Sequence, residues 1–100
     1  MSNAIDTYTV YILRCNDGQF YTGITNDIER RLQEHQTGYN PKAYTFKRRP
    51  VELVFTEHFN DPVSAIAFEK QLKGWRRQKK EALIRGDWAS LPELSERYKP

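Results

Sequence analysis

The feature that most constrains the fold is residues 8–15, a β-branched and aromatic run that is apolar on both of its alternating sets. In a strand, Val10 and Ile12 point to one side, whereas Tyr11 and Leu13 point to the other. A strand that is apolar on both sides needs cover on both sides. This run therefore predicts the central strand of a sheet, with further elements packed on each face.

A tight turn and a second strand follow. Asp17-Gly18 accepts the positive φ angles that hairpin turns need. The sequence therefore predicts a hairpin in which residues 20–25 return antiparallel to the first strand. If the turn is symmetric about this pair, Tyr11 lies opposite about residue 24 and Tyr21 opposite about residue 14.

Capping signals place a helix after the hairpin. Asn26 can accept hydrogen bonds from the free backbone N–H groups of a helix start, and Glu29 lies three positions later, as in a capping box. Gly38 suits the left-handed position that ends a helix. Residues 39–50, which include two prolines, are expected to form a basic loop.

A third strand is predicted from the next alternating segment. Val51, Leu53 and Phe55 face one side of it, and Val54 faces the other. Such alternation is typical of a strand with one face on a core, so residues 51–58 are expected to complete the sheet.

The rest of the chain predicts two helices and a tail. Asp61, followed by proline, starts a helix that is expected to run to about Gly74, and another covers roughly residues 76–85. The tail at 86–100 is expected to pack as a short helix or turn. With 100 residues, the chain is predicted to be one domain, a small α/β sandwich of order β-β-α-β-α-α.

The positive charge is concentrated in two blocks. The net charge is only +3, but residues 42–49 and 70–80 contain no acidic residue. Basic blocks interleaved with aromatic residues are typical of surfaces that bind polyanions, although a solvated helix face and a charged loop give the same pattern. The basic residues of the two blocks are Lys42, Lys47, Arg48, Arg49, Lys70, Lys73, Arg76, Arg77, Lys79 and Lys80.

Some classes of protein are disfavoured by what the sequence lacks. No apolar run is long enough for a membrane-spanning helix, and the first residues have neither the basic region nor the apolar stretch of a secretory signal. Cys15 is the only cysteine, which excludes an internal disulfide and a cysteine-based zinc site. We therefore expect a cytoplasmic protein with no membrane partner.

Two polar residues lie on the predicted inner face of the first helix. Ile28, Arg31, Leu32 and His35 follow the i, i+3, i+4, i+7 spacing of a core-facing stripe. An arginine on such a stripe has to meet an anion or reach water, and His35 lies one turn from it. Either both residues lie at the edge of the stripe, with Arg31 paired to a structural carboxylate, or they belong to a functional site.

The second helix contains a carboxylate in similar surroundings. Glu69 lies among apolar residues on the helical wheel, where its charge requires a cation. Lys73, four residues on, is one candidate for that cation, and a divalent metal ion is the other. The residues that make this helix apolar almost all round are Val63, Ala65, Ile66, Ala67, Phe68 and Leu72.

The hairpin contributes two tyrosines and a glycine. Tyr11 and Tyr21 are either core residues with one hydrogen-bonded hydroxyl each or a pair of phenols on one face of the sheet. Gly23, in the second strand, indicates a bulge or a close approach of the backbone to a ligand.

Taken together, these positions resemble the GIY-YIG nuclease family. Its two signature triplets correspond to Thr9-Val10-Tyr11, which keeps only the tyrosine, and Tyr21-Thr22-Gly23. The family's helix arginine, ten residues past the second signature tyrosine, corresponds to Arg31, and the histidine one turn later corresponds to His35. The metal-binding glutamate, on the helix after the third strand, corresponds to Glu69.

The resemblance covers about residues 8–85 and is closest to small stand-alone bacterial members. It implies a single GIY-YIG-like domain over 1–100, built as a small sandwich with a three-stranded antiparallel sheet flanked by helices. It also implies an endonuclease that hydrolyses the phosphodiester bonds of nucleic acid, with DNA favoured over RNA. The implied cofactor is Mg²⁺ or Mn²⁺.

The same resemblance implies a role for each site residue. Glu69 holds the metal ion, and Arg31 grips the non-bridging phosphate oxygens with parallel N–H donors. Tyr11 acts as the general base, its phenol pKa lowered by Arg31 and the metal. Tyr21 orients the water or Tyr11, and His35 supports the base or replaces it. The phosphate contacts that position nucleic acid come from Lys42, Lys47, Arg48, Arg49, Lys73, Arg76, Arg77, Lys79 and Lys80.

Two other functions stay open. One is a non-catalytic nucleic-acid-binding module on the same fold. The other is a protein-interaction domain that uses Trp75 and Trp88. Affinity for nucleic acid that falls steeply with salt separates the first from the second, and cleavage separates the nuclease from both.

Overall fold

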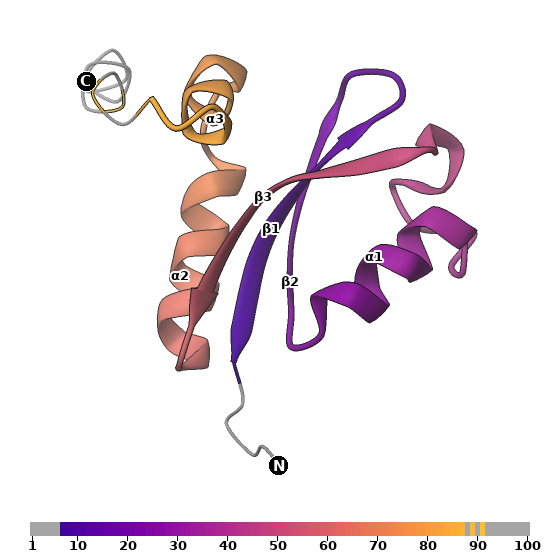
Figure 1. The fold of residues 1–100 in the computed structure, drawn as a ribbon, viewed down its shortest axis with the longest axis horizontal. Coiled ribbons are helices and arrows are strands. Elements are labelled where there is room, and N and C mark those ends of the chain that lie inside the picture. Colours follow the sequence, from indigo (N-terminus) through magenta and orange to yellow (C-terminus); the bar gives the residue numbers. More distant parts are fainter. Residues whose placement is uncertain (1–6, 88, 90, 92–100) are drawn as a thin grey trace.

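The computed structural model describes residues 7–87, 89 and 91, and Figure 1 shows how they are arranged. The order of elements is β-β-α-β-α-α, as predicted. The strands are β1 (Tyr8–Cys15), β2 (Phe20–Thr25) and β3 (Val51–Phe59). The helices are α1 (Ile28–Thr37), α2 (Pro62–Lys73) and α3 (Arg77–Ile84), and a short 3₁₀ turn covers Phe46–Arg48.

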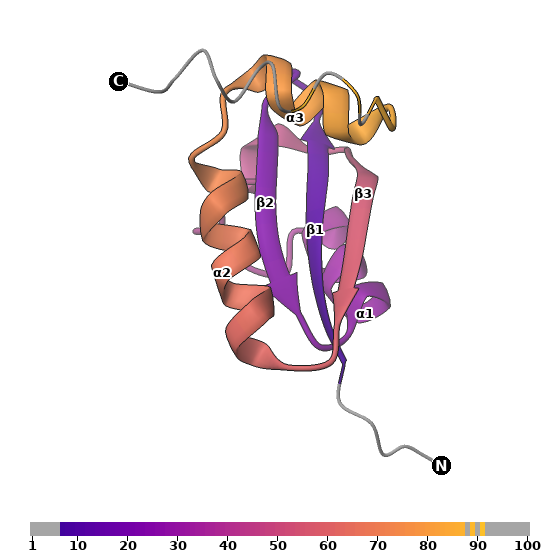
Figure 2. The ribbon, with the colours of Figure 1, turned by 90° about the vertical axis from the view of Figure 1, so that its left-hand side faces the viewer.

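β1 is the central strand of the sheet. The strand order is β2-β1-β3, and both pairings are antiparallel. Figures 1 and 2 show α1 on one face of the sheet and α2 with α3 on the other. Val10 and Ile12 belong to the core on the α2 side, whereas Tyr11 and Leu13 belong to the core on the α1 side. The prediction of a strand covered on both faces is confirmed.

The hairpin register differs by one residue from a symmetric two-residue turn. Tyr11 pairs with Gly23, not with the residue after it. The loop contains three residues, because the Cys15 backbone N–H donates to the Gln19 carbonyl at 2.8 Å and closes it. Gly18 lies within this loop at φ 86°, the left-handed position that three-residue hairpin loops require.

An extra residue, Val54, interrupts the pairing of β3 with β1. Ile12 pairs with Phe55 and Leu13 pairs with Leu53, so β3 contains a bulge. As a result Phe55 packs with Val54 on the α2 side, while Leu53 packs on the α1 side. The prediction that Phe55 and Leu53 share a side is wrong, because strict alternation holds only along an unbroken ladder.

α1 begins one residue later than its capping signal indicated. Asp27, not Asn26, is the N-cap, and its carboxylate accepts a hydrogen bond from the Arg30 backbone N–H at 3.1 Å. Gly38, at φ 73°, ends the helix as predicted. Between these ends, His35 lies in the last turn and is the one buried residue of the helix.

α2 begins as predicted and buries only one of its faces. The Asp61 carboxylate accepts a hydrogen bond from the Ser64 backbone N–H at 2.8 Å. Ala65 and Leu72 are fully buried, but Val63 is 76% exposed. Although the helix is apolar almost all round, the sheet covers it from one side, so the rest of that apolar surface stays in solvent.

The tail is described only in part. Leu91 packs against the core on the α2 side. Trp88 and the residues from 92 onward lie outside the described residues, so the prediction of a packed tail stays a prediction, as does a single domain over 1–100. No helix in the described part of the chain is both long and apolar enough to cross a membrane.

Candidate active site

Tyr11 lies against the backbone of the neighbouring strand. A Cβ atom built on its ladder partner, Gly23, lies 2.5 Å from the Tyr11 hydroxyl oxygen and 2.6 Å from the ring carbon that bears it. No side chain fits there without moving the ring, and Tyr11 is fully buried. Gly23 therefore makes room for the Tyr11 phenol, so the close approach at this position is to a side chain of the protein and not to a ligand.

His35 links Tyr11 to the loop that follows α1. The Tyr11 hydroxyl lies 3.1 Å from Nε2 of His35, and Nδ1 of the same ring lies 2.7 Å from the Thr45 hydroxyl. All three side chains are buried. They form a continuous hydrogen-bonded row from the central strand to the loop, in which the two partners fix the orientation of the imidazole.

Thr45 was not identified from the sequence. It is 1% exposed, yet it lies in the irregular loop, where no helix or strand period marks an inward position. The one available signal was indirect. A buried histidine needs a partner for each ring nitrogen, and a nearby loop hydroxyl is a candidate.

Tyr21 stands at the wall of the site. Its ring centroid lies 5.1 Å from that of His35 and 6.2 Å from that of Tyr11. Tyr44 stacks on it at 6.1 Å with an interplanar angle of 24°, and the Arg48 guanidinium covers the Tyr44 ring at 4.0 Å. Packing on these rings holds the Tyr21 phenol in place.

Arg31 reaches the site from α1 and is paired with Glu34. Its Nε atom lies 3.2 Å from the Glu34 carboxylate, which Arg30 also approaches at 3.9 Å. Glu34 is thus a carboxylate partner of the kind that one of the two alternatives for Arg31 predicted. The Arg31 side chain is 37% exposed, however. A pair this exposed is worth about 1 kcal/mol or less, so phosphate can replace the carboxylate.

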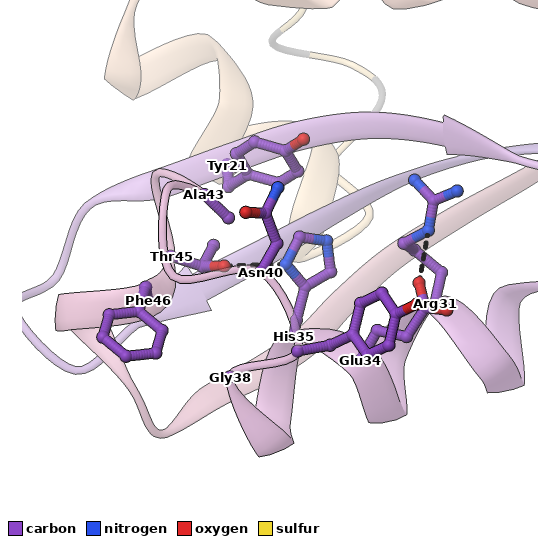
Figure 3. A pocket seen from close by; sticks show the side chains of 10 residues that line it. Tyr21, Arg31, Glu34, His35, Gly38, Asn40, Ala43, Thr45 and Phe46 are labelled. Carbon is purple, nitrogen blue, oxygen red and sulfur yellow. Dashed lines mark hydrogen bonds and ion pairs between the residues drawn. The ribbon is translucent and has the colours of Figure 1, made fainter.

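One open cavity of about 700 Å³ is bordered by Tyr21, Arg31, Glu34, His35 and Thr45 (Figure 3). Figure 3 shows His35 joined to Thr45 and Arg31 joined to Glu34, with Tyr21 across from His35. Tyr11 does not line the cavity, because its side chain is fully buried. The loop after α1 adds two aromatic lining residues, Tyr39 and Phe46.

Glu69 approaches from the other face of the sheet, at the edge formed by β2. It shares one face of α2 with Ile66 and Lys73, by the i, i+3, i+7 spacing. Ile66 borders a hollow that Arg31 also borders, and Lys73 borders a second hollow together with Tyr21. Glu69 itself lines neither of these two hollows nor the main cavity. Of the five predicted catalytic residues, Tyr21, Arg31 and His35 line the main cavity, whereas Tyr11 and Glu69 do not.

Glu69 is largely buried and paired with Lys73. Its carboxylate lies 3.2 Å from Nζ of Lys73, and its side chain is 14% exposed. Within residues 7–87, 89 and 91, no three His, Cys, Asp or Glu side chains gather in a way that could hold a metal ion. A single carboxylate fits a Mg²⁺ or Mn²⁺ ion that keeps water and phosphate oxygens as its other ligands, and it does not fit an all-protein metal site.

Burial sets the protonation states of the central pair. It raises the pKa of the Tyr11 phenol, and Tyr21 adds to the rise; the charge and hydrogen bond of Arg31 act the other way without outweighing burial. Arg31 thus acts on the Tyr11 pKa in the expected direction, and the net lowering expected from Arg31 together with a metal stays a prediction. Burial, and then the charge of Arg31, lower the pKa of His35 below 6.5. Both groups are uncharged at neutral pH.

The basic residues of the loop and of α3 do not all face solvent. Lys42 and Lys47 are exposed. Arg49 is half-buried and donates from Nε to a carbonyl of its own loop at 2.8 Å. Lys79 is 8% exposed, with its ammonium 3.9 Å from the centroid of the Trp75 ring. Lys79 therefore faces the core rather than phosphate, contrary to its predicted role.

A second set of basic residues gathers beside β2. Lys73 and Lys80 border a hollow with Tyr21, and Arg77 borders another with Lys80. Burial lowers the pKa of Lys80. Arg76, just before α3, is half-buried. Of this block, Lys73, Arg77 and Lys80 are the residues whose positions suit contacts with a phosphate chain.

Comparison with known sequences gives a consistent result. The sequence pattern of the GIY-YIG catalytic domain matches residues 7–82. The UPF0213 protein SSP2268 of Staphylococcus saprophyticus is 44% identical over 80 residues, which are 80% of this chain and 96% of that protein. A UPF0213 protein of Staphylococcus aureus is 41% identical over 81 residues, which are 81% of this chain and 98% of that protein.

Two solution NMR structures are similar as well. The UPF0213 protein BH0048 of Bacillus halodurans is 40% identical, with a TM-score of 0.53 and coverage of 79% of this chain and 83% of that one. The protein EF2693 of E. faecalis is 37% identical, with a TM-score of 0.60 and coverage of 89% and 93%. The matched segment of this chain contains all five predicted catalytic positions, from Tyr11 to Glu69.

Proposed function

The chain belongs to the GIY-YIG family, and on this premise we propose that it is a metal-dependent endonuclease that hydrolyses the phosphodiester bonds of nucleic acid, DNA in preference to RNA. Membership of the family places the chain among nucleases. The hydrolysis, the need for a metal ion and the preference for DNA are what we propose. The observation that carries it is that Tyr21, Arg31 and His35 border one open cavity while Tyr11 is hydrogen-bonded to His35.

Tyr11 and His35 provide a route for the proton of the attacking water. Because both are uncharged at neutral pH, one ring nitrogen of His35 carries a proton and the other accepts one. The reaction uses the tautomer with the proton on Nδ1, toward Thr45, which leaves Nε2 to accept from the Tyr11 hydroxyl. Tyr11 is buried, so the phenol that meets the water is Tyr21 at the cavity wall. The proton passes from water to Tyr21, from Tyr21 to Tyr11 and from Tyr11 to His35.

Arg31 binds the phosphate that is attacked. Its guanidinium is planar and always charged, and it offers parallel N–H donors that match two phosphate oxygens. In the free protein the Nε atom of Arg31 lies 3.2 Å from the Glu34 carboxylate, which also borders the cavity. Binding of substrate exchanges that carboxylate for the phosphate, and the negative charge that develops during hydrolysis then strengthens the contact.

Glu69 is the residue that would hold the divalent ion. In the free protein the Lys73 ammonium pairs with this carboxylate, and because the Lys73 side chain is 56% exposed, it would give way to an ion at little energetic cost. When bound, such an ion neutralises charge on the phosphate and stabilises the leaving oxygen. Lys73 is then released at the hollow that Tyr21 also borders, where it can contact a flanking phosphate.

The binding-module alternative has one observation in its favour. The pairing of Glu69 with Lys73 satisfies the carboxylate without any metal, so the same residues could serve the fold alone. The protein-interaction alternative loses support, because Trp75 packs against the core with the Lys79 ammonium over its ring. Trp88 lies outside the described residues.

Cleavage by matched pairs of variants tests the proposal. The substrates are single-stranded, nicked and branched DNA, and single-stranded RNA, each with Mg²⁺ or Mn²⁺. Arg31→Ala should lower the rate by about 10²–10³-fold, whereas Arg30→Ala, which removes the other partner of Glu34, should leave it nearly unchanged.

The second pair concerns the metal ligand. Glu69→Gln should abolish metal-dependent cleavage, whereas Glu81→Gln breaks an equivalent i, i+4 ion pair with Arg77 and should not. Salt-sensitive binding with no cleavage of any substrate by the unaltered protein would instead establish the binding module.

A further inference from the structure

The cavity extends well beyond the residues needed for hydrolysis. Tyr21, Arg31 and His35 occupy one part of it, and the remainder is walled by residues of the loop that follows α1. At about 700 Å³ it falls within the roughly 300–1,000 Å³ typical of small-molecule sites. The proposed reaction leaves this additional space without a role.

Two aromatic residues border that space in different ways. Tyr39 is 75% exposed, and its ring has no aromatic or cationic partner among the contacts of the described residues. Phe46 is fixed, because Arg49 covers its ring at 4.6 Å and the backbone of Gly38 packs closely against both. One aromatic side chain is held in place and one is free to stack on a ligand.

The charge of the lining indicates an uncharged ligand. The charged residues that border the cavity are Arg31 and Glu34, which pair at 3.2 Å in the free protein; when phosphate takes Arg31, Arg30 stays beside Glu34 at 3.9 Å. His35 is uncharged at neutral pH because burial lowers its pKa. A phosphate deep in this space would meet the Glu34 carboxylate. A flat, neutral group with hydrogen-bonding edges suits this space better, and Asn40 supplies a polar side chain for such an edge.

We propose that this cavity binds a single unpaired nucleobase, which stacks on Tyr39 beside the nucleotide whose phosphate Arg31 holds. The proposal rests on the proposed nuclease function for its ligand class. A base inside a continuous duplex cannot reach the cavity without leaving the stack, so the preferred substrate is a strand with an unpaired nucleotide at the site. Stacking on aromatic side chains is a general way to hold such bases without reading their identity.

The test is a binding experiment in the absence of divalent ions, so that cleavage does not interfere. The three probes are a duplex, the same duplex with one bulged nucleotide, and that bulge with an abasic nucleotide, each prepared as DNA and as RNA. The unaltered protein should bind the bulged probe about 5- to 150-fold more tightly than the other two, the range expected for one stacked base.

Substitution of Tyr39 should remove this preference. Tyr39→Ala should bind all three probes alike, while Tyr39→Phe keeps the preference because stacking needs only the ring. Val63→Ala, which truncates an equally exposed apolar side chain on α2, should behave as the unaltered protein. Equal affinity of the unaltered protein for the bulged and abasic probes, or a preference that survives Tyr39→Ala, overturns the base site.

Failure of this inference is distinguishable from failure of the nuclease. Cleavage that depends on Glu69 together with no base-dependent binding refutes only the base site. Base-dependent binding through Tyr39 together with no cleavage supports the base site and refutes the nuclease.

Discussion

Replacement of Gly23 by alanine tests whether the position of Tyr11 is set by the strand beside it. The added Cβ would lie 2.5 Å from the Tyr11 hydroxyl oxygen, 2.6 Å from the ring carbon that bears it and 3.0 Å from the next one. Ordinary contact begins at 3.4 Å, so the tip of the ring has to retreat by about 0.9 Å. Because Tyr11 is fully buried, the movement has to displace neighbouring core atoms.

The energetic consequence follows from overpacking. An extra carbon forced into a packed core costs about 1–3 kcal/mol, which for a chain of this size lowers the melting temperature by about 4–8 °C for each kcal/mol. The Tyr11 hydroxyl is also displaced from its 3.1 Å contact with Nε2 of His35. We therefore expect Gly23→Ala to lose both stability and most of the cleavage rate.

Urea unfolding and initial cleavage rates measure the two effects. Gly74→Ala is the matched control, because nothing lies within 3.5 Å of a Cβ built there and the backbone φ is −85°. It should be neutral or slightly stabilising. The reasoning is refuted if Gly23→Ala unfolds at the same urea concentration as Gly74→Ala and cleaves at the rate of the unaltered protein.

Three further predictions follow from the site and its surroundings. Thr45→Val leaves Nδ1 of His35 without its partner, so it should lower stability by about 1–3 kcal/mol and shift the pH profile of cleavage. Thr45→Ser keeps the hydroxyl and should restore both. Identical pH profiles for the unaltered protein and the two variants would contradict this. The pKa of His35 in the folded protein lies below the 6.5 of the unfolded chain, so the unfolded chain binds that proton more readily and stability should fall as the pH drops below about 6.5. Urea unfolding from about pH 7.5 to about pH 5 should show a smaller loss of stability for His35→Gln than for the unaltered protein. An equal loss in both proteins would count against burial of His35 as the cause. Lys79 is buried against Trp75, so Lys79→Ala should lower the melting temperature and leave the salt dependence of nucleic-acid binding unchanged. Lys47→Ala should do the opposite: it should reduce that salt dependence and leave the melting temperature unchanged. The reverse result would show that Lys79 reaches phosphate.

Much of the scaffold could be predicted because its signals are local. A strand that is apolar on both sides had to be central, and Asp61 followed by proline had to start a helix. The bulge at Val54 could not be predicted, because it depends on which residue of the partner strand each residue meets. The three-residue hairpin loop has the same origin, since an Asp-Gly pair allows both loop lengths.

The sequence indicated which positions form the candidate site, but it did not indicate how deeply their side chains are buried or which partners they contact. Arg31 and His35 were detectable because polar groups interrupted an apolar stripe. Thr45 and the burial of Lys79 were not, since both follow from tertiary packing of residues whose types are ordinarily exposed. For a related reason, the sequence indicated the nearby cation that lowers the Tyr11 pKa but not the depth of burial that outweighs this cation in the free protein.

The central claim is that Arg31 holds the attacked phosphate in the cavity, beside the Tyr21 phenol and facing the side chain of Glu69. The most direct measurement is a crystal structure of the Glu69→Gln protein with a bound oligonucleotide that contains one unpaired nucleotide. The account predicts a phosphate within hydrogen-bonding distance of the Arg31 guanidinium, beside the Tyr21 hydroxyl and facing residue 69. A strand that runs over Lys42 and Lys47 alone, with Arg31 still paired to Glu34, would contradict it.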